Sequence, residues 1–327
     1  METESSIVWI RQAFYGSSDR VIFLPWVGEF GCFIKDWLPY IQAYRAQCKT
    51  ICCKPGEEIF FPSAADFIFY EKNPIPDFMR EHNRYAEYTG EYKLTIDNLI
   101  ENCKTILKEK IRNLGEENFI FIEPFDWGIE DKDHPLYKVK IPFESPDLNS
   151  IHVDYPEVII CCRKRLVRSE RNWPYWNDIF NFLKLHNLSF GIAGEEETSY
   201  SGGNHHLWNY SPEFRNKILI SWLKNCKFVI TTDTSIAHLA ARMNIPLFLF
   251  WLSPMEENKK IVKPQINYIK NTHQGILKIC DPNLWDKPNE IIKELSNFLI
   301  ILNKNPPMIS TPFEIKGFAP YKAYRQF

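Results

Sequence analysis

The segment from Phe228 to Trp251 constrains the fold of this chain more than any other. It begins with the run Phe228-Val229-Ile230, whose β-branched and aromatic composition is typical of a buried strand. A polar turn at residues 232–235 leads into a stretch whose apolar side chains recur at helical spacing. A second apolar run begins after Pro246. A strand, a helix and another strand this close together predict parallel strands in an α/β domain.

The polar turn of this segment is the first candidate site. Its residues, Thr232, Asp233, Thr234 and Ser235, can cap a helix with a side-chain oxygen. Such a turn lies at the carboxyl end of a strand, where the free amide hydrogens of a helix N-terminus bind phosphorylated ligands. His238 shares a helix face with Thr234, so both can approach one ligand. The alternative is an ordinary helix cap and a packing histidine.

The run Asp-Thr-Ser-Ile-Ala-His-Leu-Ala at residues 233–240 resembles the D-[TS]-[GS]-x-x-H-x-A segment of the heptosyltransferase-like (glycosyltransferase family 9) GT-B glycosyltransferases. In that family the segment holds the diphosphate of a nucleotide-sugar donor. The resemblance therefore implies donor contacts by Asp233, Thr234, Ser235 and His238. It also implies an α/β fold of the GT-B type, in which two Rossmann-like domains with parallel sheets face each other across a cleft.

Two motifs upstream extend the resemblance. Arg171-Asn172-Trp173-Pro174 matches the family's K/R-x-W-P, whose basic residue contacts donor phosphate, a task that suits the planar and permanently charged guanidinium. Gly194 and the three glutamates after it resemble the family's Gly-x-x-E turn, whose acidic residue engages the nucleoside. We prefer Glu196, although the register leaves Glu195 and Glu197 open. The alternatives are a surface arginine before a helix start, and a solvated acidic turn.

A strand that ends in Arg163, Lys164 and Arg165 adds a further candidate. One of these cations is expected to contact phosphate; we take Arg163, and the sequence does not decide among the three.

The first half carries the candidate base. Gly28-Glu29-Phe30-Gly31 follows an apolar strand at residues 21–25 and resembles the family's first-strand turn, whose glycines let backbone approach a sugar. In the family, the residue at this position is Asp, the proposed base. Here the residue is Glu29. The assignment therefore stays open against a structural glutamate, with Asp36 as the second candidate.

The resemblance implies an inverting, metal-independent glycosyltransferase that needs no cofactor. It would move a sugar from a nucleotide-sugar donor to a hydroxyl of a glycan acceptor, which can be part of a glycolipid or glycoprotein. A GT-B-like nucleotide-sugar epimerase, or a catalytically inactive nucleotide-sugar-binding protein, remains an alternative. The glutamate in place of aspartate favours the inactive protein.

The order of the predicted elements divides the chain into two halves. We predict an acceptor-binding domain at residues 1–150, a donor-binding domain at 151–305, and a tail at 306–327 that could pack back on the first domain. The predicted strands lie at 21–25, 49–54, 65–70, 118–123, 157–162, 188–193, 228–230 and 247–252, and the predicted helices at 32–46, 95–114, 176–186, 213–225, 235–243 and 289–302. Residues 198–212 are predicted as a loop.

Composition narrows the partners and the compartment. A net charge of −2 over 327 residues gives no general attraction to nucleic acid or to anionic membranes. Nine cysteines without a CxxC motif predict free thiols in a reducing compartment. The sequence shows no signal peptide and no apolar run of the roughly 20 residues that cross a bilayer. The expectation is a cytoplasmic protein without a transmembrane segment.

Three further patterns are set aside. Asp131-Lys132-Asp133 has the form of a D-x-D metal motif but lies in a polar run instead of after a buried strand. His205-His206 has no ligand partner at zinc spacing. No GxGxxG motif is present, which argues against a dehydrogenase.

Overall fold

The computed structural model describes most of the chain in the following ranges: 20–26, 30–46, 48–61, 64, 66–69, 101, 105, 108, 119–122, 135–148, 151–164, 172–250 and 256–304. Several predicted features lie outside them. These are Gly28 and Glu29, Arg165, Arg171, the Asp131-Lys132-Asp133 run, the tail at 306–327 and most of the helix predicted at 95–114.

The first half holds a parallel sheet of four strands. Its strands are β1 (Arg20–Phe23), β2 (Cys48–Cys53), β3 (Asp66–Phe69) and β4 (Phe119–Ile122), in the order β3-β2-β1-β4. Every pairing is parallel, so the chain must cross over between successive strands. The four strands predicted from the sequence are confirmed.

The helical segment after β1 contains a widened turn. It consists of α2 (Phe30–Cys32), the π-helix η1 (Phe33–Trp37) and α3 (Leu38–Ala43). The N–H of Leu38 bonds to the carbonyl of Phe33, five residues back, just before Pro39, which has no N–H to donate. Below this segment, the ring of Phe23 on β1 contacts Trp37 edge-on at a centroid distance of 5.7 Å. The predicted helix at 32–46 is therefore confirmed as a helical segment with an irregular first part.

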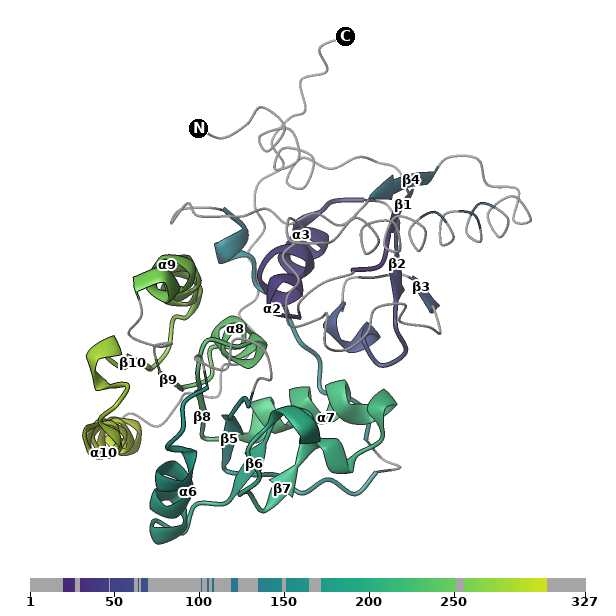
Figure 1. The fold of residues 1–327 in the computed structure, drawn as a ribbon. Coiled ribbons are helices and arrows are strands. Elements are labelled where there is room, and N and C mark those ends of the chain that lie inside the picture. The colour runs from purple at the N-terminus through teal and green to yellow at the C-terminus, as the bar shows by residue number, and fades with distance from the viewer. Residues whose placement is uncertain are drawn as a thin grey trace.

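The second half holds a parallel sheet of six strands (Figure 1). In chain order these are β5 (Val158–Cys161), β6 (Phe190–Ile192), β7 (His205–His206), β8 (Phe228–Thr231), β9 (Leu247–Leu249) and β10 (Leu277–Ile279). Their order in the sheet, β10-β9-β8-β5-β6-β7, is that of the doubly wound Rossmann fold, and it reverses between β5 and β8. The predicted α/β fold with two parallel sheets is confirmed.

The helices of the second half cover both faces of its sheet. They are α6 (Trp176–Leu185), α7 (Pro212–Asn225), α8 (Ser235–Arg242), α9 (Glu256–Thr272) and α10 (Pro288–Lys304). Short 3-10 turns lie at η2 (Glu58–Phe60), η3 (Pro135–Lys138), η5 (Glu196–Thr198), η6 (Leu207–Asn209) and η7 (Pro282–Leu284). Helix α9, strand β10 and the short strand β7 were not predicted from the sequence. Helix α9 starts in a run of charged residues and contains Pro264, which hid its helical period.

Alternate residues of the central strands serve two apolar cores. Val158 and Ile160 on β5 face the core under α6 and α10. Ile159 faces the other core, which also contains Val21 and Ile51 of the first sheet. The period-two pattern of a strand thus joins the second sheet to α6 and α10 on one face, and to α7, α8, α9 and the first half on the other.

The two halves contact each other along several elements. Helix α2 packs against α8, and η3 packs against α9 (Figure 1). At Gly56, whose φ is 88°, a β-carbon would lie 2.6 Å from the carbonyl oxygen of Glu213 on α7, so only glycine fits there. The first sheet ends at residue 122 and the second begins at 158. The predicted boundary at residue 150 falls between them and stays a prediction.

The turns at the amino ends of β9 and β10 are fastened to each other. Asn244, the residue directly after the helix predicted at 235–243, has a φ of 57°, and its Oδ1 accepts from the N–H of Gln274 at 2.8 Å. The buried imidazole of His273 bonds to the carbonyl of Ile245 through Nε2 at 2.8 Å and accepts from the N–H of Gly275 through Nδ1 at 3.0 Å. Both ring nitrogens are therefore engaged by the neutral imidazole.

This geometry predicts a pH dependence of stability. Burial lowers the pKa of His273 below its ordinary 6.5, against the opposing effect of its two backbone bonds. The unfolded chain then binds the proton more readily, so stability should fall as pH drops below about 6.5. His273→Asn should lower Tm at pH 7.5 yet show a flatter decline of Tm between pH 7 and 5.5. His152→Gln, at a side chain that is 91% exposed, is the control and should leave both unchanged. Equal slopes in wild type and His273→Asn would contradict this account.

Candidate functional site

The candidate site lies where the strand order of the second sheet reverses. Strands β5 and β8 are neighbours, and their carboxyl ends lead into Arg163 and into the turn at residues 232–234. In open α/β sheets this reversal point is where ligands bind, because the connections on either side leave in opposite directions. The sequence-predicted turn and the predicted basic strand end are therefore adjacent in the sheet.

Thr234 is the N-cap of α8 but does not cap it with its side chain. Its backbone is extended, with φ −140° and ψ 168°, and its hydroxyl makes no cap bond. Instead, Thr234 Oγ1 lies 2.8 Å from Thr231 Oγ1, and Thr231 donates to the carbonyl of Thr232 at 2.9 Å. The first amide groups of α8 therefore receive no side-chain cap from Thr234.

Asp233 and His238 form a buried pair beside this helix end. Asp233 Oδ1 and His238 Nε2 are 3.5 Å apart, and both side chains are less than a tenth exposed. The imidazole contacts the ring of Tyr268 edge-on at 5.1 Å. Within the described part of the chain, His238 Nδ1 is buried and has no hydrogen-bond partner. The site thus holds a buried polar nitrogen next to a helix start that its N-cap residue, Thr234, does not cap with its side chain.

Helix α2 of the first half reaches the same place. A β-carbon placed on Gly31 would lie 3.5 Å from His238 Cδ2 and 3.8 Å from the Cα of Ser235. Helix α2, which follows β1 in the chain, therefore approaches the first turn of α8. Asp36, the second candidate base, is fully buried and pairs with Lys35 at 3.2 Å. That burial excludes it from contact with a substrate in this conformation.

The basic strand end is tied to the turn after β6. The backbone of Arg163 forms an isolated antiparallel β-bridge with the backbone of Ser199. The N–H of Lys164 bonds to the carbonyl of Thr198 at 2.7 Å. The side chain of Arg163 is half-buried and that of Lys164 is exposed. These contacts join the predicted phosphate-contacting segment to the predicted glutamate turn.

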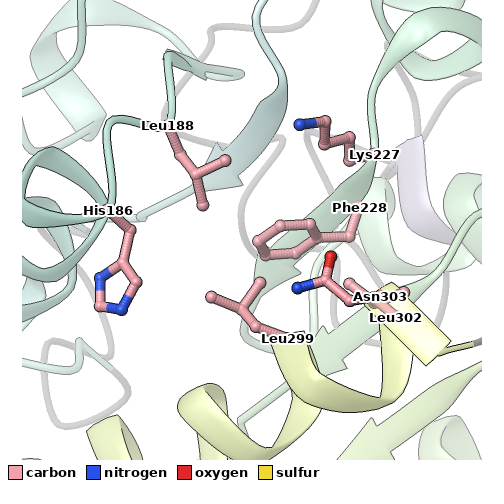
Figure 2. Close-up of a pocket in the computed structure, with 7 residues that line it drawn as sticks. All are labelled: His186, Leu188, Lys227, Phe228, Leu299, Leu302 and Asn303. Atoms are coloured by element: carbon pink, nitrogen blue, oxygen red, sulfur yellow. The ribbon is translucent and has the colours of Figure 1, made fainter.

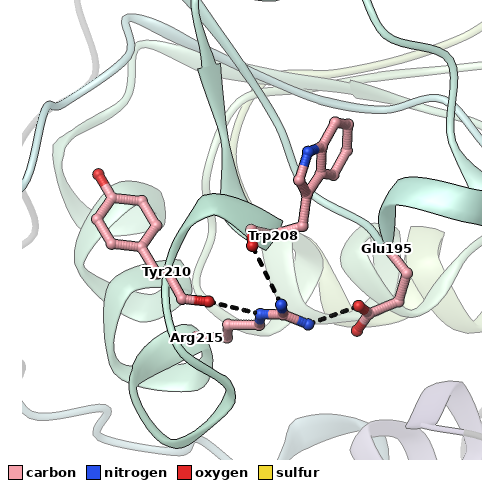
Figure 3. A network of polar contacts seen from close by, with 4 residues as sticks. All are labelled: Glu195, Trp208, Tyr210 and Arg215. Atoms are coloured by element: carbon pink, nitrogen blue, oxygen red, sulfur yellow. Dashed lines mark hydrogen bonds and ion pairs between the residues drawn. The ribbon is translucent and has the colours of Figure 1, made fainter.

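The three glutamates of that turn differ in their contacts. Glu195 accepts from Arg215 Nη1 at 2.6 Å, and the same guanidinium donates to the carbonyls of Tyr210 and Trp208 (Figure 3). Glu196 and Glu197 are exposed. Arg215 thus binds Glu195 and links this turn to η6. No local sequence signal marks Arg215, because its partners lie in separate loops.

An aromatic pair lies next to the glutamate turn, at the carboxyl end of β7. The imidazole of His206 stacks on the indole of Trp208 at a centroid distance of 4.4 Å. Burial and the neighbouring His205 lower the pKa of His206, while the charge of Glu196 opposes them. His205 and His206, which were set aside as a zinc site, therefore form the short strand β7, and the ring of His206 is stacked on Trp208. Within the described residues no cluster of His, Cys, Asp and Glu could hold a metal ion.

The Arg171 motif is positioned by its tryptophan. Trp173 is fully buried, its Nε1 donates to the carbonyl of Trp285 at 2.8 Å, and its indole stacks on Phe250 at 4.8 Å. Helix α6 starts three residues later at Trp176. Trp173 thereby fixes the chain two residues after Arg171, which itself lies outside the described residues.

A pocket lies away from the candidate site. This pocket, of about 350 Å³, is lined by His186, Leu188, Lys227, Phe228, Leu299, Leu302 and Asn303 (Figure 2). Lys227 and Phe228 are at the amino end of β8, whereas the candidate site is at its carboxyl end. The pocket therefore belongs to the opposite edge of the sheet.

Every cysteine in the described part of the chain is a free thiol, as the composition predicted. Among the helices formed by described residues, none has the length and hydropathy of a membrane span.

Comparison with known proteins returns matches among solved structures alone. No protein-family profile matches the sequence, and no curated protein matches it. The E. coli heptosyltransferase WaaC with ADP is 12% identical and has a TM-score of 0.47, with 85% of this chain and 99% of that chain covered. A family 9 glycosyl transferase from Veillonella parvula DSM 2008 is 10% identical and has a TM-score of 0.49, with 87% and 98% covered. The spinosyn rhamnosyltransferase SpnG is 13% identical and has a TM-score of 0.36, with 86% and 91% covered.

All three TM-scores lie below 0.5 and the identities are 10–13%, so any activity has to be inferred from the residues of this chain.

The hydroxyl pair under the site gives a stability prediction. Thr231→Val should lower the free energy of unfolding by roughly 1–3 kcal/mol, because the buried hydroxyl of Thr234 loses its partner. Chemical denaturation measures the change. Ser221→Ala is the control. Its hydroxyl bonds to that of Tyr155, which is 48% exposed, so water can replace the lost bond. A loss for Thr231→Val no larger than for Ser221→Ala would show that the pair does not stabilise the turn.

Proposed function

We propose that this protein is a glycosyltransferase that moves a sugar from a nucleotide-sugar donor to a hydroxyl of a glycan acceptor, free or carried by a lipid or protein. The observation that carries the proposal is the first turn of α8, which Thr234 does not cap with its side chain. It lies at the strand-order reversal, with buried His238 beside it and Gly31 of α2 packed against it. A helix start of this kind binds a diphosphate through its amide hydrogens and its dipole.

The proposed donor contacts follow the carboxyl edge of the second sheet. The diphosphate would receive amide hydrogen bonds from Thr234 and Ser235, with Asp233 and His238 at its side. Arg171 and Arg163 would supply positive charge from the β5 side. Glu196 would accept from the ribose hydroxyls, because Arg215 already engages Glu195.

The proposed reaction is a single displacement with inversion at the anomeric carbon. Glu29 removes the proton from the acceptor hydroxyl, and the oxygen attacks the anomeric carbon as its bond to the diphosphate breaks. The nucleoside diphosphate leaves with the electron pair of that bond. Arg171 and the start of α8 offset its charge, so we propose that no metal ion is required.

The first test is binding of nucleoside diphosphates without metal. ADP, UDP and GDP are added separately to the protein in EDTA, and Tm is measured. We expect at least one to raise Tm, because a ligand that binds the native state stabilises it. Binding that disappears in EDTA and returns with manganese or magnesium would contradict the metal-free site, and Asp131-Lys132-Asp133 would then need to be reconsidered.

Arg171→Ala is the matched variant for this test. It should weaken diphosphate binding by about 1.5–3 kcal/mol, the usual contribution of a hydrogen bond to a charged group. The nucleoside monophosphate lacks the outer phosphate and should lose less. An equal loss for both ligands would place Arg171 at the nucleoside or in the fold.

The second test concerns the base. Glu29→Gln keeps the shape of the side chain but removes its ability to accept a proton. We expect kcat to fall about 10²–10⁴-fold with diphosphate binding unchanged, the usual contribution of general-base catalysis. Glu29→Asp, which keeps the carboxylate, should retain part of the activity. Wild-type turnover by Glu29→Gln would exclude Glu29 as the base, and turnover of the donor without acceptor would instead indicate an epimerase.

A further inference from the structure

One buried arginine joins the candidate donor helix to the other half of the protein. Arg242 is in the last turn of α8 and is 8% exposed. Its Nη1 donates to the carbonyls of Leu136 at 2.9 Å and Val139 at 2.8 Å, with Tyr137 at 3.4 Å, and its Nη2 donates to the carbonyl of Lys35 at 3.1 Å. All four acceptors precede the second sheet by sequence.

These contacts need a guanidinium. A buried cation is costly unless it is hydrogen-bonded, and Arg242 meets carbonyls of two separate elements, η1 and the segment around η3. The planar fork of arginine can donate in two directions at once, whereas the ammonium of lysine is a compact point charge. Removal of the side chain would leave this set of carbonyls without their common donor.

The ring of Tyr268 connects the same arginine to the candidate site. Arg242 lies over the ring of Tyr268 at 5.2 Å, and His238 contacts that ring at 5.1 Å. Tyr137, of the first half, meets it edge-on at 5.1 Å. Tyr268 is fully buried, so the four side chains form one packed group between the halves.

We propose that Arg242 is a positioning residue that holds the first half against α8, so that α2, the helix directly after Glu29 in the chain, stays at the first turn of α8. This inference rests on the proposed function, in which the acceptor base comes from one half and the donor diphosphate is bound by the other. Arg242 touches neither substrate. It sets the distance between the groups that do.

Another contact between the halves provides a matched control. Lys217 on α7 pairs with Glu58 at 3.2 Å, and both side chains are partly exposed. Exposed pairs of this kind contribute little to stability. Lys217→Met therefore removes a cation from the same interface without changing the buried group around Arg242.

The experiment compares Arg242→Lys, Arg242→Met and Lys217→Met with wild type in three measurements. Hydrogen exchange is followed in peptides covering η1 and η3. The Kd is measured for the diphosphate, among ADP, UDP and GDP, that raises Tm most. The kcat is measured with the nucleotide sugar and acceptor that show transfer.

We expect faster exchange in η1 and η3 for both Arg242 variants, because the carbonyls of these elements lose their donor. The Kd should stay within about twofold, while kcat falls roughly 10²-fold, the scale for a misplacement of about 1 Å. Arg242→Lys should be the milder variant, and Lys217→Met should match wild type in all three measurements.

Two results would overturn the proposal. One is unchanged exchange and kcat in both Arg242 variants. The other is a loss of diphosphate affinity as large as the loss of kcat, which would make Arg242 a support of the donor site itself. If wild type binds no nucleoside diphosphate, the proposed function fails, and the exchange measurement still decides whether Arg242 fastens the two halves.

Discussion

The parallel pairing of β8 with β5 and β9 determines the position of every group discussed above. It aligns the end of β8 with the end of β5, so that α8 starts at the point where the strand order reverses. Because alternate residues of these strands face opposite cores, Ile230 and Phe248 pack under α10 while Val229 and Leu247 pack toward the first half. A shift of one residue in this register would exchange the two faces of the sheet. Helix α8 would then lose its packing against α2 and α9.

The start of α8 is costly as a purely structural arrangement. A serine or threonine whose side chain caps a helix usually contributes about 1 kcal/mol, and Thr234 is of the right type at the right position. Its hydroxyl nevertheless bonds to Thr231, and the buried Nδ1 of His238 has no partner among the described residues. The first amide groups of α8 lack a side-chain cap from Thr234, and the Nδ1 of His238 lacks a partner in the described part of the chain. A bound anion explains both more economically than packing does.

The parts of the fold that could be predicted are those set by neighbouring residues. The β8–α8–β9 segment and its stop at Asn244 follow from apolar spacing and from the tolerance of asparagine for a positive φ. The engagement of Glu195 by Arg215, and the four carbonyls bound by Arg242, could not be predicted. The acceptors of Arg242 lie 103–207 residues away. Backbone carbonyls also carry no residue identity, so no pattern at positions 136–139 indicates the contact.

Helix α8 is short, so it brings the locally predictable residues of its first turn close to Arg242 in its last turn. Its eight residues span about 12 Å, so its first and last turns move as one rigid body. The first turn carries the side chains that a local motif identifies, and the last turn carries the arginine that long-range packing engages. Tyr268 fills the space between His238 and Arg242, which leaves little room for the two ends to shift independently. The geometry of the candidate donor site is therefore set by the first half as well as by the sheet that contains it.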